Sequence, residues 1–338
     1  MEKSEVDLLV VGAGPTGIAL GAEARRAGLE VLIVDRGALT ANLLNFPTYM
    51  NFFTSSDQLE VAGLPFTVPE EKPSLQQTLV YYRAVVEYFG IPLALFEEVE
   101  SIERATDGFT VHSRGKDGIK KRRARAVALA TGYFANPKHL GVDGEDLSWV
   151  HSRYRDPYRD FGRRVVIVGG GNSAAEAALE LWRAGVEVAM VVRAEGFKPT
   201  VKYWVKPDIE NRVAEGSIGA LFRCEVVRFE EGGVVVRREG GEERVPADTA
   251  YVLIGYLPDA GFERAVGVEV DTETLVPRFD PDTCESNVPG LYLAGTIQAG
   301  SNTGRIFIDN SRNHSKLIVR HLATRLGKEL PTASGVLG

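Results

Sequence analysis

The chain has 338 residues, 44% of them hydrophobic and 25% charged, which is typical of a globular protein of about two domains. A formal net charge of -7 argues against general binding to nucleic acid, which favours a basic surface. No apolar run reaches the ~18 residues of a membrane span, and the first apolar segment starts too early for a signal peptide, so we expect neither.

The first motif is a strand, a glycine-rich turn, a helix and a second strand between residues 6 and 35. In the turn, Gly12 is expected to allow a tight bend, Gly14 to let the backbone approach a pyrophosphate, and Gly17 to let the helix pack on the strand. Asp35 ends the second strand, where a carboxylate accepts hydrogen bonds from ribose hydroxyls. Together these features predict a dinucleotide at the free N–H groups of the helix start.

The same pattern returns between residues 163 and 193, with the turn GGGNSA at residues 169–174. Its second strand ends at Arg193, and an arginine attracts the 2′-phosphate that an acidic residue would repel. The second motif is therefore predicted to bind NADPH, and the first motif FAD. Lys198 and Lys202 follow Arg193 and either add to this positive charge or are ordinary solvated lysines.

Two more buried strands with small-residue turns, in residues 126–137 and 288–300, are expected to close the flavin site. The predicted fold class is α/β, with two Rossmann-like domains and the NADPH domain inserted into the FAD domain. The predicted boundaries are residues 1–135 and 276–330 for the FAD domain, 136–275 for the NADPH domain with its linkers, and 331–338 for a frayed tail.

Cysteine and histidine usage is sparse. The two cysteines, Cys224 and Cys284, are far apart in the sequence, which favours a reduced, cytoplasmic chain over a disulfide framework. Cys224 lies in a predicted strand and is expected to be core, whereas Cys284 lies in a loop and is expected to be solvated or lightly packed. The five histidines form neither an HExxH motif nor a close cluster with cysteine, so no metal site is predicted.

Four stretches outside the glycine motifs carry a resemblance to a known family, at residues 45–66, 72–91, 201–212 and 291–315. They resemble the bacillithiol disulfide reductase family, within the thioredoxin-reductase-like flavoproteins, and together they span almost the whole chain. The resemblance implies a homo-oligomeric flavoprotein that binds FAD, takes hydride from NADPH and reduces the disulfide of a small thiol.

The resemblance also implies cofactor contacts at individual positions. The implied flavin contacts are Gly12, Gly14, Pro15, Thr16, Gly17, Asp35, Arg36, Asn45, Thr54, Thr131, Gly132 and Gly295. The residues implied to lie beside the flavin or the pyrophosphate are Thr296, Ile297, Arg305 and Ile306. The implied NADPH contacts are Gly169, Gly171, Asn172, Ser173, Ala174 and Arg193, to which the charge pattern adds Lys198.

The chain departs from this family at residue 16. The family's first turn commonly reads GGGPCG, whereas this chain reads GAGPTG and has no CxxC motif, so Thr16 stands where a cysteine would face the flavin. A threonine hydroxyl cannot replace a thiolate in disulfide exchange, and we expect Thr16 to hydrogen-bond the cofactor instead. Tyr133 and His314 are the other catalytic candidates, His314 as a proton source for a reduced thiol.

The sequence leaves the electron acceptor open. Besides a small disulfide, it allows a ferredoxin, a flavodoxin, a quinone or oxygen. It also allows a flavin monooxygenase or an NADPH-binding flavoprotein without turnover. Residues 116–125 bear on the choice, because six of the ten are Lys or Arg in an otherwise acidic chain. This segment either steers a small acidic electron carrier or is a solvated hairpin.

Overall fold

The computed structural model describes residues 5–329, and these residues form two compact units. The described part of the first unit comprises residues 5–44, 49–136 and 257–329, and the second unit comprises residues 45–48 and 137–256. Among residues 5–329, no helix has both the length and the apolar character needed to cross a membrane. The tail that we expected to fray, 331–338, lies outside the described residues.

The first unit is built on a seven-stranded sheet in the order β3-β2-β1-β6-β5-β4, with β15 also paired to β6. The pairs β1–β2, β1–β6, β2–β3 and β6–β15 are parallel, and β4–β5 and β5–β6 are antiparallel. The strands are β1 (Glu5–Val11), β2 (Val31–Asp35), β3 (Leu93–Leu95), β4 (Glu98–Ala105), β5 (Gly108–Gly115), β6 (Gly118–Leu129) and β15 (Leu291–Leu293). Leu8, Leu9 and Val10 are fully buried, as the apolar run predicts for a strand covered on both faces.

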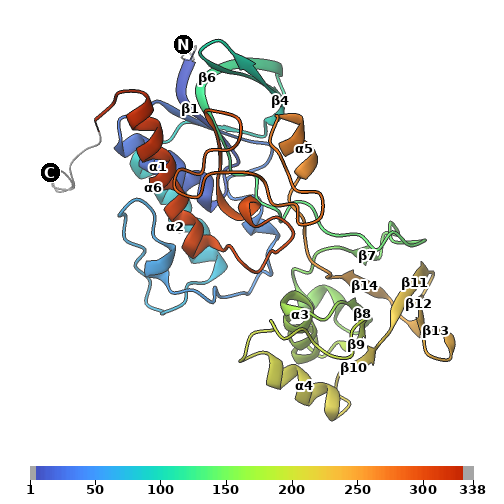
Figure 1. Ribbon diagram of the computed structural model, residues 1–338. Coiled ribbons are helices and arrows are strands. Elements are labelled where there is room, and N and C mark those ends of the chain that lie inside the picture. The colour runs from blue at the N-terminus through green and yellow to red at the C-terminus, as the bar shows by residue number, and fades with distance from the viewer. Residues whose placement is uncertain (1–4, 330–338) are drawn as a thin grey trace. The chain divides into compact units, whose positions relative to one another are not determined.

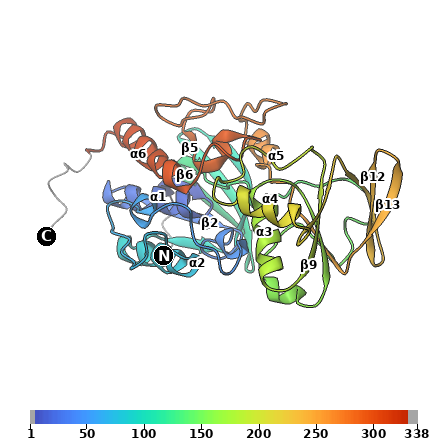
Figure 2. The same ribbon diagram turned by 90° about the horizontal axis from the view of Figure 1, so that it is seen from below.

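Two long helices of this unit pack against the helix of the first motif. The helices are α1 (Pro15–Arg26), α2 (Leu75–Phe89), α5 (Ala260–Ala265) and α6 (Ile308–Arg325). Both ribbon views place α6 beside α1, although the two helices come from opposite ends of the sequence (Figure 1 and Figure 2). Short 3-10 helices are η1 (Leu43–Asn45), η2 (Ser56–Leu59) and η4 (Gly295–Ala299). The carboxyl-terminal helix α6 is therefore in a position to contact the first glycine turn.

The second unit repeats the parallel arrangement, in the strand order β10-β9-β8-β14-β7. Its strands are β7 (Val150–His151), β8 (Arg164–Val168), β9 (Glu187–Val192), β10 (Gly219–Phe222) and β14 (Thr249–Val252). Its helices are α3 (Asn172–Arg183), α4 (Lys206–Ala214) and the 3-10 helix η3 (Pro157–Asp160). A separate antiparallel sheet, β11 (Glu225–Glu230), β12 (Gly233–Arg238) and β13 (Gly241–Pro246), lies away from α3 and α4 (Figure 1 and Figure 2). The predicted pair of Rossmann-like folds is confirmed.

The second unit ends earlier than the sequence suggested. The predicted NADPH domain runs to residue 275, but residues 257–275 group with the first unit. The reason is apolar packing: Val268 is buried in the core cluster of the first unit, and Phe262, Val266 and Val270 pack against that cluster. Residues 257–275 are rich in polar and turn residues, as linkers often are, and this composition does not reveal that these four apolar side chains pack into a core.

Candidate functional site

The first glycine turn has no room for side chains at two of its three glycines. Gly12 has φ +115°, and a Cβ there would overlap the carbonyl oxygen of Ala130. A Cβ at Gly17 would overlap the carbonyl oxygen of Gly12, so only glycine lets α1 pack this closely on the turn. At Gly14, by contrast, a Cβ would meet no atom within 4 Å. The open space lies at the position where the backbone is expected to approach a pyrophosphate.

The start of α1 provides the electrostatics for an anion. Its N-cap, Gly14, offers no side-chain cap to the orphan N–H groups, and the first turn carries no acidic residue. The helix dipole adds positive potential at the same place. Asp35 at the end of β2 accepts hydrogen bonds from the backbone N–H groups of Ala13 at 2.6 Å and Gly37 at 2.7 Å. Each carboxylate oxygen keeps a further lone pair for a ribose hydroxyl. These residues fit the diphosphate and ribose of FAD.

Most of the remaining predicted flavin residues come from several elements of the first unit. Thr131 and Gly132 follow β6, and Gly295 and Thr296 follow its parallel neighbour β15, so they meet at the carboxyl edge of the sheet. A Cβ on Gly132 would lie 3.6 Å from Thr296 Oγ1. Pro15 is the first residue of α1, Thr54 is buried, and Ile306 is half-buried just before α6.

Four predicted flavin residues have surroundings that the sequence did not indicate. Ile297 is fully buried in the core cluster of the first unit. Arg36 pairs with Glu98 at 3.5 Å. Arg305 is exposed, and its carbonyl oxygen accepts a hydrogen bond from Asn310. Asn45 lies on the short stretch of residues 45–48 that groups with the second unit.

Thr16 is surrounded by α6 and the end of β15. Its Oγ1 lies 3.0 Å from Ser311 Oγ, and Ser311 is buried in the second turn of α6. A Cβ on Gly295, which has φ +82°, would lie 2.9 Å from Thr16 Oγ1, so the two residues are in direct contact. The Gly295 N–H donates to His314 Nδ1 over 3.1 Å. The structure thus brings together two catalytic candidates, Thr16 and His314, and adds Ser311, which the sequence did not single out.

The ionisation of the candidates follows from burial. Desolvation lowers the pKa of His314 to about 4, so its imidazole is neutral near pH 7. The proton-source role suggested by the sequence needs the imidazolium, which this environment disfavours. Tyr133 donates a hydrogen bond from its hydroxyl to the carbonyl oxygen of Thr303 over 3.3 Å, and burial raises its pKa. Tyr133 is therefore a neutral phenol beside the loop that precedes α6.

The second glycine turn repeats the geometry of the first. Gly169 has φ +138°, and a Cβ there would overlap the carbonyl oxygen of Leu253. Ala174 is fully buried where the first turn has Gly17, and Ser173 is exposed at the helix start. The side chain of Asn172 is bonded to the segment 200–202, because Oδ1 accepts from the Lys202 N–H at 2.9 Å and Nδ2 donates to the Thr200 carbonyl at 3.0 Å. Its backbone N–H and the second proton of Nδ2 remain for a phosphate.

The three cations beyond this turn differ in their surroundings. Arg193 and Lys198 are exposed, and neither forms an ion pair with any residue in the range 5–329. The Lys198 side chain passes over Gly171, where a Cβ would lie 3.7 Å from Lys198 Cδ. Lys202, in contrast, pairs with Glu176 of α3 at 2.6 Å. Two cations at the end of β9 therefore remain for a phosphate, and the third is already neutralised.

Neither cysteine is accessible. Cys224 is 1% exposed, which confirms its assignment to the core. Cys284 is also 1% exposed, so the expectation of a solvated or lightly packed thiol is wrong. Its loop folds back onto the sheet, and the Cys284 carbonyl accepts from the N–H of Leu293 in β15. Burial raises the pKa of both thiols, so neither is a reactive thiolate.

The basic segment of residues 116–125 forms the turn and first part of the β5–β6 hairpin, and most of its charge is paired. Lys120 and Arg122 both contact Glu97, which is buried. Arg123 pairs with Glu5 at 3.6 Å, and Arg125 lies 3.9 Å from Asp7. Four of the six cations thus have a carboxylate partner in their own unit, which reduces the field that the segment offers to an acidic carrier.

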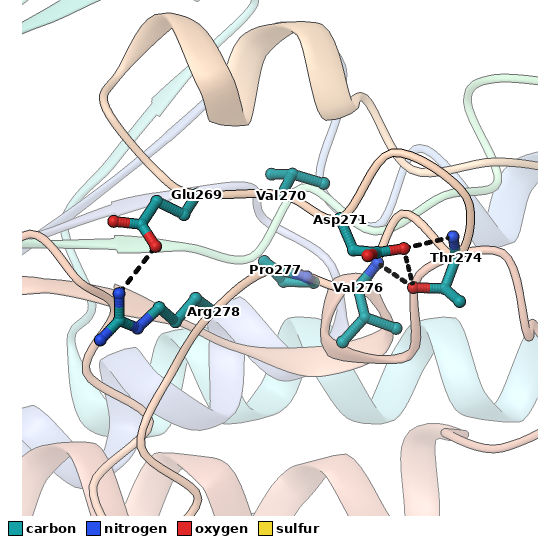
Figure 3. Close-up of a pocket in the computed structure, with 7 residues that line it drawn as sticks. All are labelled: Glu269, Val270, Asp271, Thr274, Val276, Pro277 and Arg278. Atoms are coloured by element: carbon teal, nitrogen blue, oxygen red, sulfur yellow. Dashed lines mark hydrogen bonds and ion pairs between the residues drawn. The ribbon is translucent and has the colours of Figure 1, made fainter.

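A hollow of about 660 Å³ opens along residues 269–278 of the first unit (Figure 3). Its lining residues are Glu269, Val270, Asp271, Thr274, Val276, Pro277 and Arg278. The polar groups that line it bond to one another, since Glu269 pairs with Arg278 at 2.7 Å and Asp271 accepts from the N–H and hydroxyl of Thr274 at 2.7 Å (Figure 3). None of these residues belongs to the predicted cofactor site.

Comparison with known proteins agrees with the two glycine turns. The family model for pyridine nucleotide-disulphide oxidoreductases matches residues 9–295. The chain is 34% identical over 320 residues to bacilliredoxin reductase Bdr of Bacillus subtilis, covering 94% of this chain and 97% of that protein. It is 26% identical over 302 residues to a ferredoxin–NADP reductase of Ignicoccus hospitalis, covering 86% of this chain and 90% of that protein.

A solved structure extends the match to three dimensions. The bacillithiol disulfide reductase Bdr (YpdA) from Bacillus cereus superposes with a TM-score of 0.93 at 33% identity, covering 95% of this chain and 99% of that one. The predicted cofactors, FAD and NADPH, are those of this family, and the chain is an FAD-dependent NADPH oxidoreductase. The chain therefore belongs to the pyridine nucleotide-disulphide oxidoreductases and, among them, to the bacillithiol disulfide reductase family that its sequence resembles.

Proposed function

We propose that this chain uses NADPH to reduce a low-molecular-weight disulfide of the bacillithiol type, and that it does so without a protein thiol. The reaction consumes NADPH, the disulfide and one proton, and it yields NADP⁺ and two thiols as the S–S bond breaks. When bound, FAD supplies the two-electron chemistry that links the nicotinamide to the acceptor. The second part of the proposal, that no protein thiol takes part, rests on the burial of the two cysteine thiols.

The whole sequence contains two cysteines, and both are 1% exposed. Disulfide exchange needs a thiolate that can reach the substrate sulfur, and burial raises the pKa of Cys224 and Cys284. At the start of α1, Thr16 offers only a hydroxyl. Since no side chain of this protein can form a mixed disulfide, the electrons must pass to the acceptor directly from the cofactor.

Each unit supplies part of the proposed cofactor binding. In the first unit, the open backbone at Gly14, the uncapped start of α1 and the Asp35 carboxylate support contacts to FAD. In the second unit, the start of α3 with Gly169 and Gly171 supports a pyrophosphate, and Arg193 and Lys198 support the 2′-phosphate that distinguishes NADPH from NADH.

An anaerobic experiment tests the acceptor. The flavin of the holoenzyme is first bleached with one equivalent of NADPH, bacillithiol disulfide is added, and the visible flavin band is followed in time. We expect rapid return of the band together with two thiols per disulfide. If the band stays bleached, the disulfide proposal is wrong, and ferredoxin, flavodoxin and quinone are then tried under the same conditions.

A thiol-blocking experiment tests the absence of a protein thiol. We expect N-ethylmaleimide to leave wild-type turnover unchanged, because the reagent finds no accessible sulfur. The matched variant Thr16→Cys places a thiol at the start of α1, where the Thr16 hydroxyl lies 3.0 Å from Ser311 Oγ, and should become sensitive to the reagent. Inactivation of the wild type, with protection by Cys284→Ser, would contradict the proposal.

Two finer properties belong to the same proposal. Two free, buried cysteines suit a reducing compartment, so we propose a cytoplasmic location. Homo-oligomerisation is likewise proposed from the family resemblance alone. Light scattering of the purified holoenzyme checks it, and a mass near 36.8 kDa for the particle would indicate a monomer.

A further inference from the structure

Two polar residues of α6 contact the predicted flavin site one helical turn apart. Ser311 reaches Thr16 at the start of α1, and His314 reaches the backbone of Gly295 after β15. Thr16 and Gly295 touch each other, so α6 contacts both residues of one continuous wall. Ser311 is 1% exposed, so its hydroxyl is shielded from bulk solvent.

A second contact of Ser311 bears on the direction of its hydrogen bond with Thr16. Ser311 Oγ lies 3.3 Å from the carbonyl oxygen of Ile308 and 3.0 Å from Thr16 Oγ1. Either hydroxyl can donate across the contact between Ser311 and Thr16. The Ile308 carbonyl oxygen can only accept, and the arrangement that satisfies both contacts directs the single proton of Ser311 to Ile308. Ser311 then accepts from Thr16, and Thr16 keeps only lone pairs for a ligand. In this arrangement Thr16 is a hydrogen-bond acceptor on the cofactor side.

The contact between Gly295 and His314 determines which ring nitrogen of the histidine carries the proton. Because the Gly295 N–H donates to Nδ1, that nitrogen of His314 carries no proton, and a neutral imidazole then carries its proton on Nε2. Nε2 makes no hydrogen bond to a residue that the structure describes. The ring has one cause of its pKa shift, desolvation, and no charged side chain contributes to that shift.

We propose that Ser311 and His314 are positioning residues for the wall formed by Thr16 and Gly295: Ser311 makes the Thr16 hydroxyl an acceptor, and His314 holds the Gly295 peptide as an uncharged ring. The inference rests on the proposed function only in taking this wall to face the flavin. It assigns neither residue the role of proton donor to the acceptor.

The first test follows the imidazole itself in the wild-type holoenzyme. Isotope-labelled histidine gives five ring signals, and the one that vanishes in His314→Asn is His314. We expect a neutral ring protonated at Nε2, with no titration between about pH 5.5 and pH 8. A midpoint near the ordinary value of about 6.5, or a proton on Nδ1, would overturn the proposal.

The second test compares two replacements of His314. In His314→Asn, the side-chain carbonyl oxygen occupies the place of Nδ1 and can still accept from Gly295, whereas His314→Leu removes the acceptor. We expect the flavin midpoint potential and the rate of flavin reduction by NADPH to stay within about twofold of wild type for Asn, and that rate to fall by about three- to tenfold for Leu. Equal behaviour of the two variants would contradict a role through Nδ1.

The third test is a double-mutant cycle between the hydroxyls. Thr16→Val keeps the shape of residue 16 and removes its proton, and Ser311→Ala removes the partner. If the two act through one hydrogen bond, the double variant shifts the flavin potential no further than either single variant. Additive shifts would show that Ser311 does not act through Thr16. All three tests use only NADPH, the flavin and the ring signals, so failure to reduce bacillithiol disulfide would sink the proposed function and leave these results standing.

Discussion

The two glycine turns of the chain have the same backbone and different surroundings. Gly12 and Gly169 each have positive φ and lie against a carbonyl oxygen of a neighbouring strand end, Ala130 in one unit and Leu253 in the other. The helix-start side chains then diverge. Thr16 of the first turn bonds to a distant helix, α6, whereas Asn172 of the second turn holds the nearby segment 200–202.

The comparison distinguishes the features that bind any dinucleotide from the features that select one dinucleotide over another. Close backbone packing is common to both turns, so it provides the pyrophosphate site and nothing more specific. We propose that the strand ends supply the selection, with the Asp35 carboxylate in the first unit and the exposed Arg193 in the second. The helix-start side chains decide which further element completes each site.

The largest expected effect comes from closing the space behind the first turn. Gly17→Ala places a Cβ against the Gly12 carbonyl oxygen, and the helix must move, at a cost of about 1–3 kcal/mol or more. We expect purified protein with little FAD and a lowered melting temperature. Ala174→Gly is the matched change in the second turn and should shift the melting temperature much less, by about 1 kcal/mol of helix propensity. FAD retained at wild-type levels in Gly17→Ala would mean that the two turns do not differ in this way.

Buried carboxyls extend the comparison of the two units. Asp160 of the second unit accepts hydrogen bonds from Thr249 at 2.7 Å and Tyr251 at 2.6 Å. Glu263 of the first unit is 1% exposed, and neither of its oxygens has a partner within the described chain. Desolvation, reinforced by Asp259, raises the pKa of Glu263 from 4.5 to about 8. The unfolded state therefore releases this proton at lower pH than the native state does.

From this difference we expect stability to fall as pH rises from about 4.5 to about 8 and to level off above that. The contribution is about 5 kcal/mol at most, since each unit of pKa difference corresponds to about 1.4 kcal/mol. Glu263→Gln cannot ionise and should flatten this slope in melting curves taken across the window. Glu269→Gln removes an exposed carboxylate paired to Arg278 and serves as the control, with the wild-type slope retained. An unchanged slope in Glu263→Gln would mean that the carboxyl is hydrated.

Arg193 sharpens the comparison at the strand ends. Arg193→Glu places an acid where the first motif has Asp35, so the second site should lose its attraction for the 2′-phosphate. We expect KM for NADPH to rise about 10- to 100-fold, with KM for NADH unchanged or lower, because a charged hydrogen bond contributes about 1.5–3 kcal/mol. Steady-state kinetics with both nucleotides measure this.

The control for Arg193 is Arg223→Ala, which removes a cation of the same unit that pairs with Glu195. It should leave the ratio of the two KM values within about twofold of wild type. If Arg223→Ala changes the ratio as much as Arg193→Glu does, general charge and not the strand end sets the preference.

The smallest effect is expected at Asn172. Asn172→Ala removes two hydrogen bonds to the segment 200–202, each of which contributes about 1 kcal/mol. We expect KM for NADPH to rise only a few-fold, since the backbone N–H stays in place, while limited proteolysis near Lys202 becomes faster. A loss of NADPH binding as large as that of Arg193→Glu would show that the side chain contacts the nucleotide after all.

Most of the fold and about half of the candidate site could be predicted from local sequence patterns. Gly12, Gly17 and Asp35 could be placed from sequence because each acts within one strand–turn–helix unit, where spacing fixes geometry. Ser311 could not, since it lies 295 residues from Thr16 and looks like any other polar helix residue. The burial of Cys284 and the missing partners of Glu263 are likewise tertiary properties of polar-looking segments. The tautomer of His314 follows from its contact with Gly295, and its neutral state follows from burial; the sequence reveals neither.

The inaccessibility of both cysteines also bears on survival under oxidative stress. Hydrogen peroxide converts reactive thiolates to sulfenic and then to irreversible sulfinic and sulfonic acids, in proportion to their exposure and thiolate character. Cys224 and Cys284, each 1% exposed with raised pKa, offer the oxidant almost no such target. We therefore expect a reductase with no accessible thiol to keep its turnover when peroxide levels are highest, which is when oxidised small thiols accumulate.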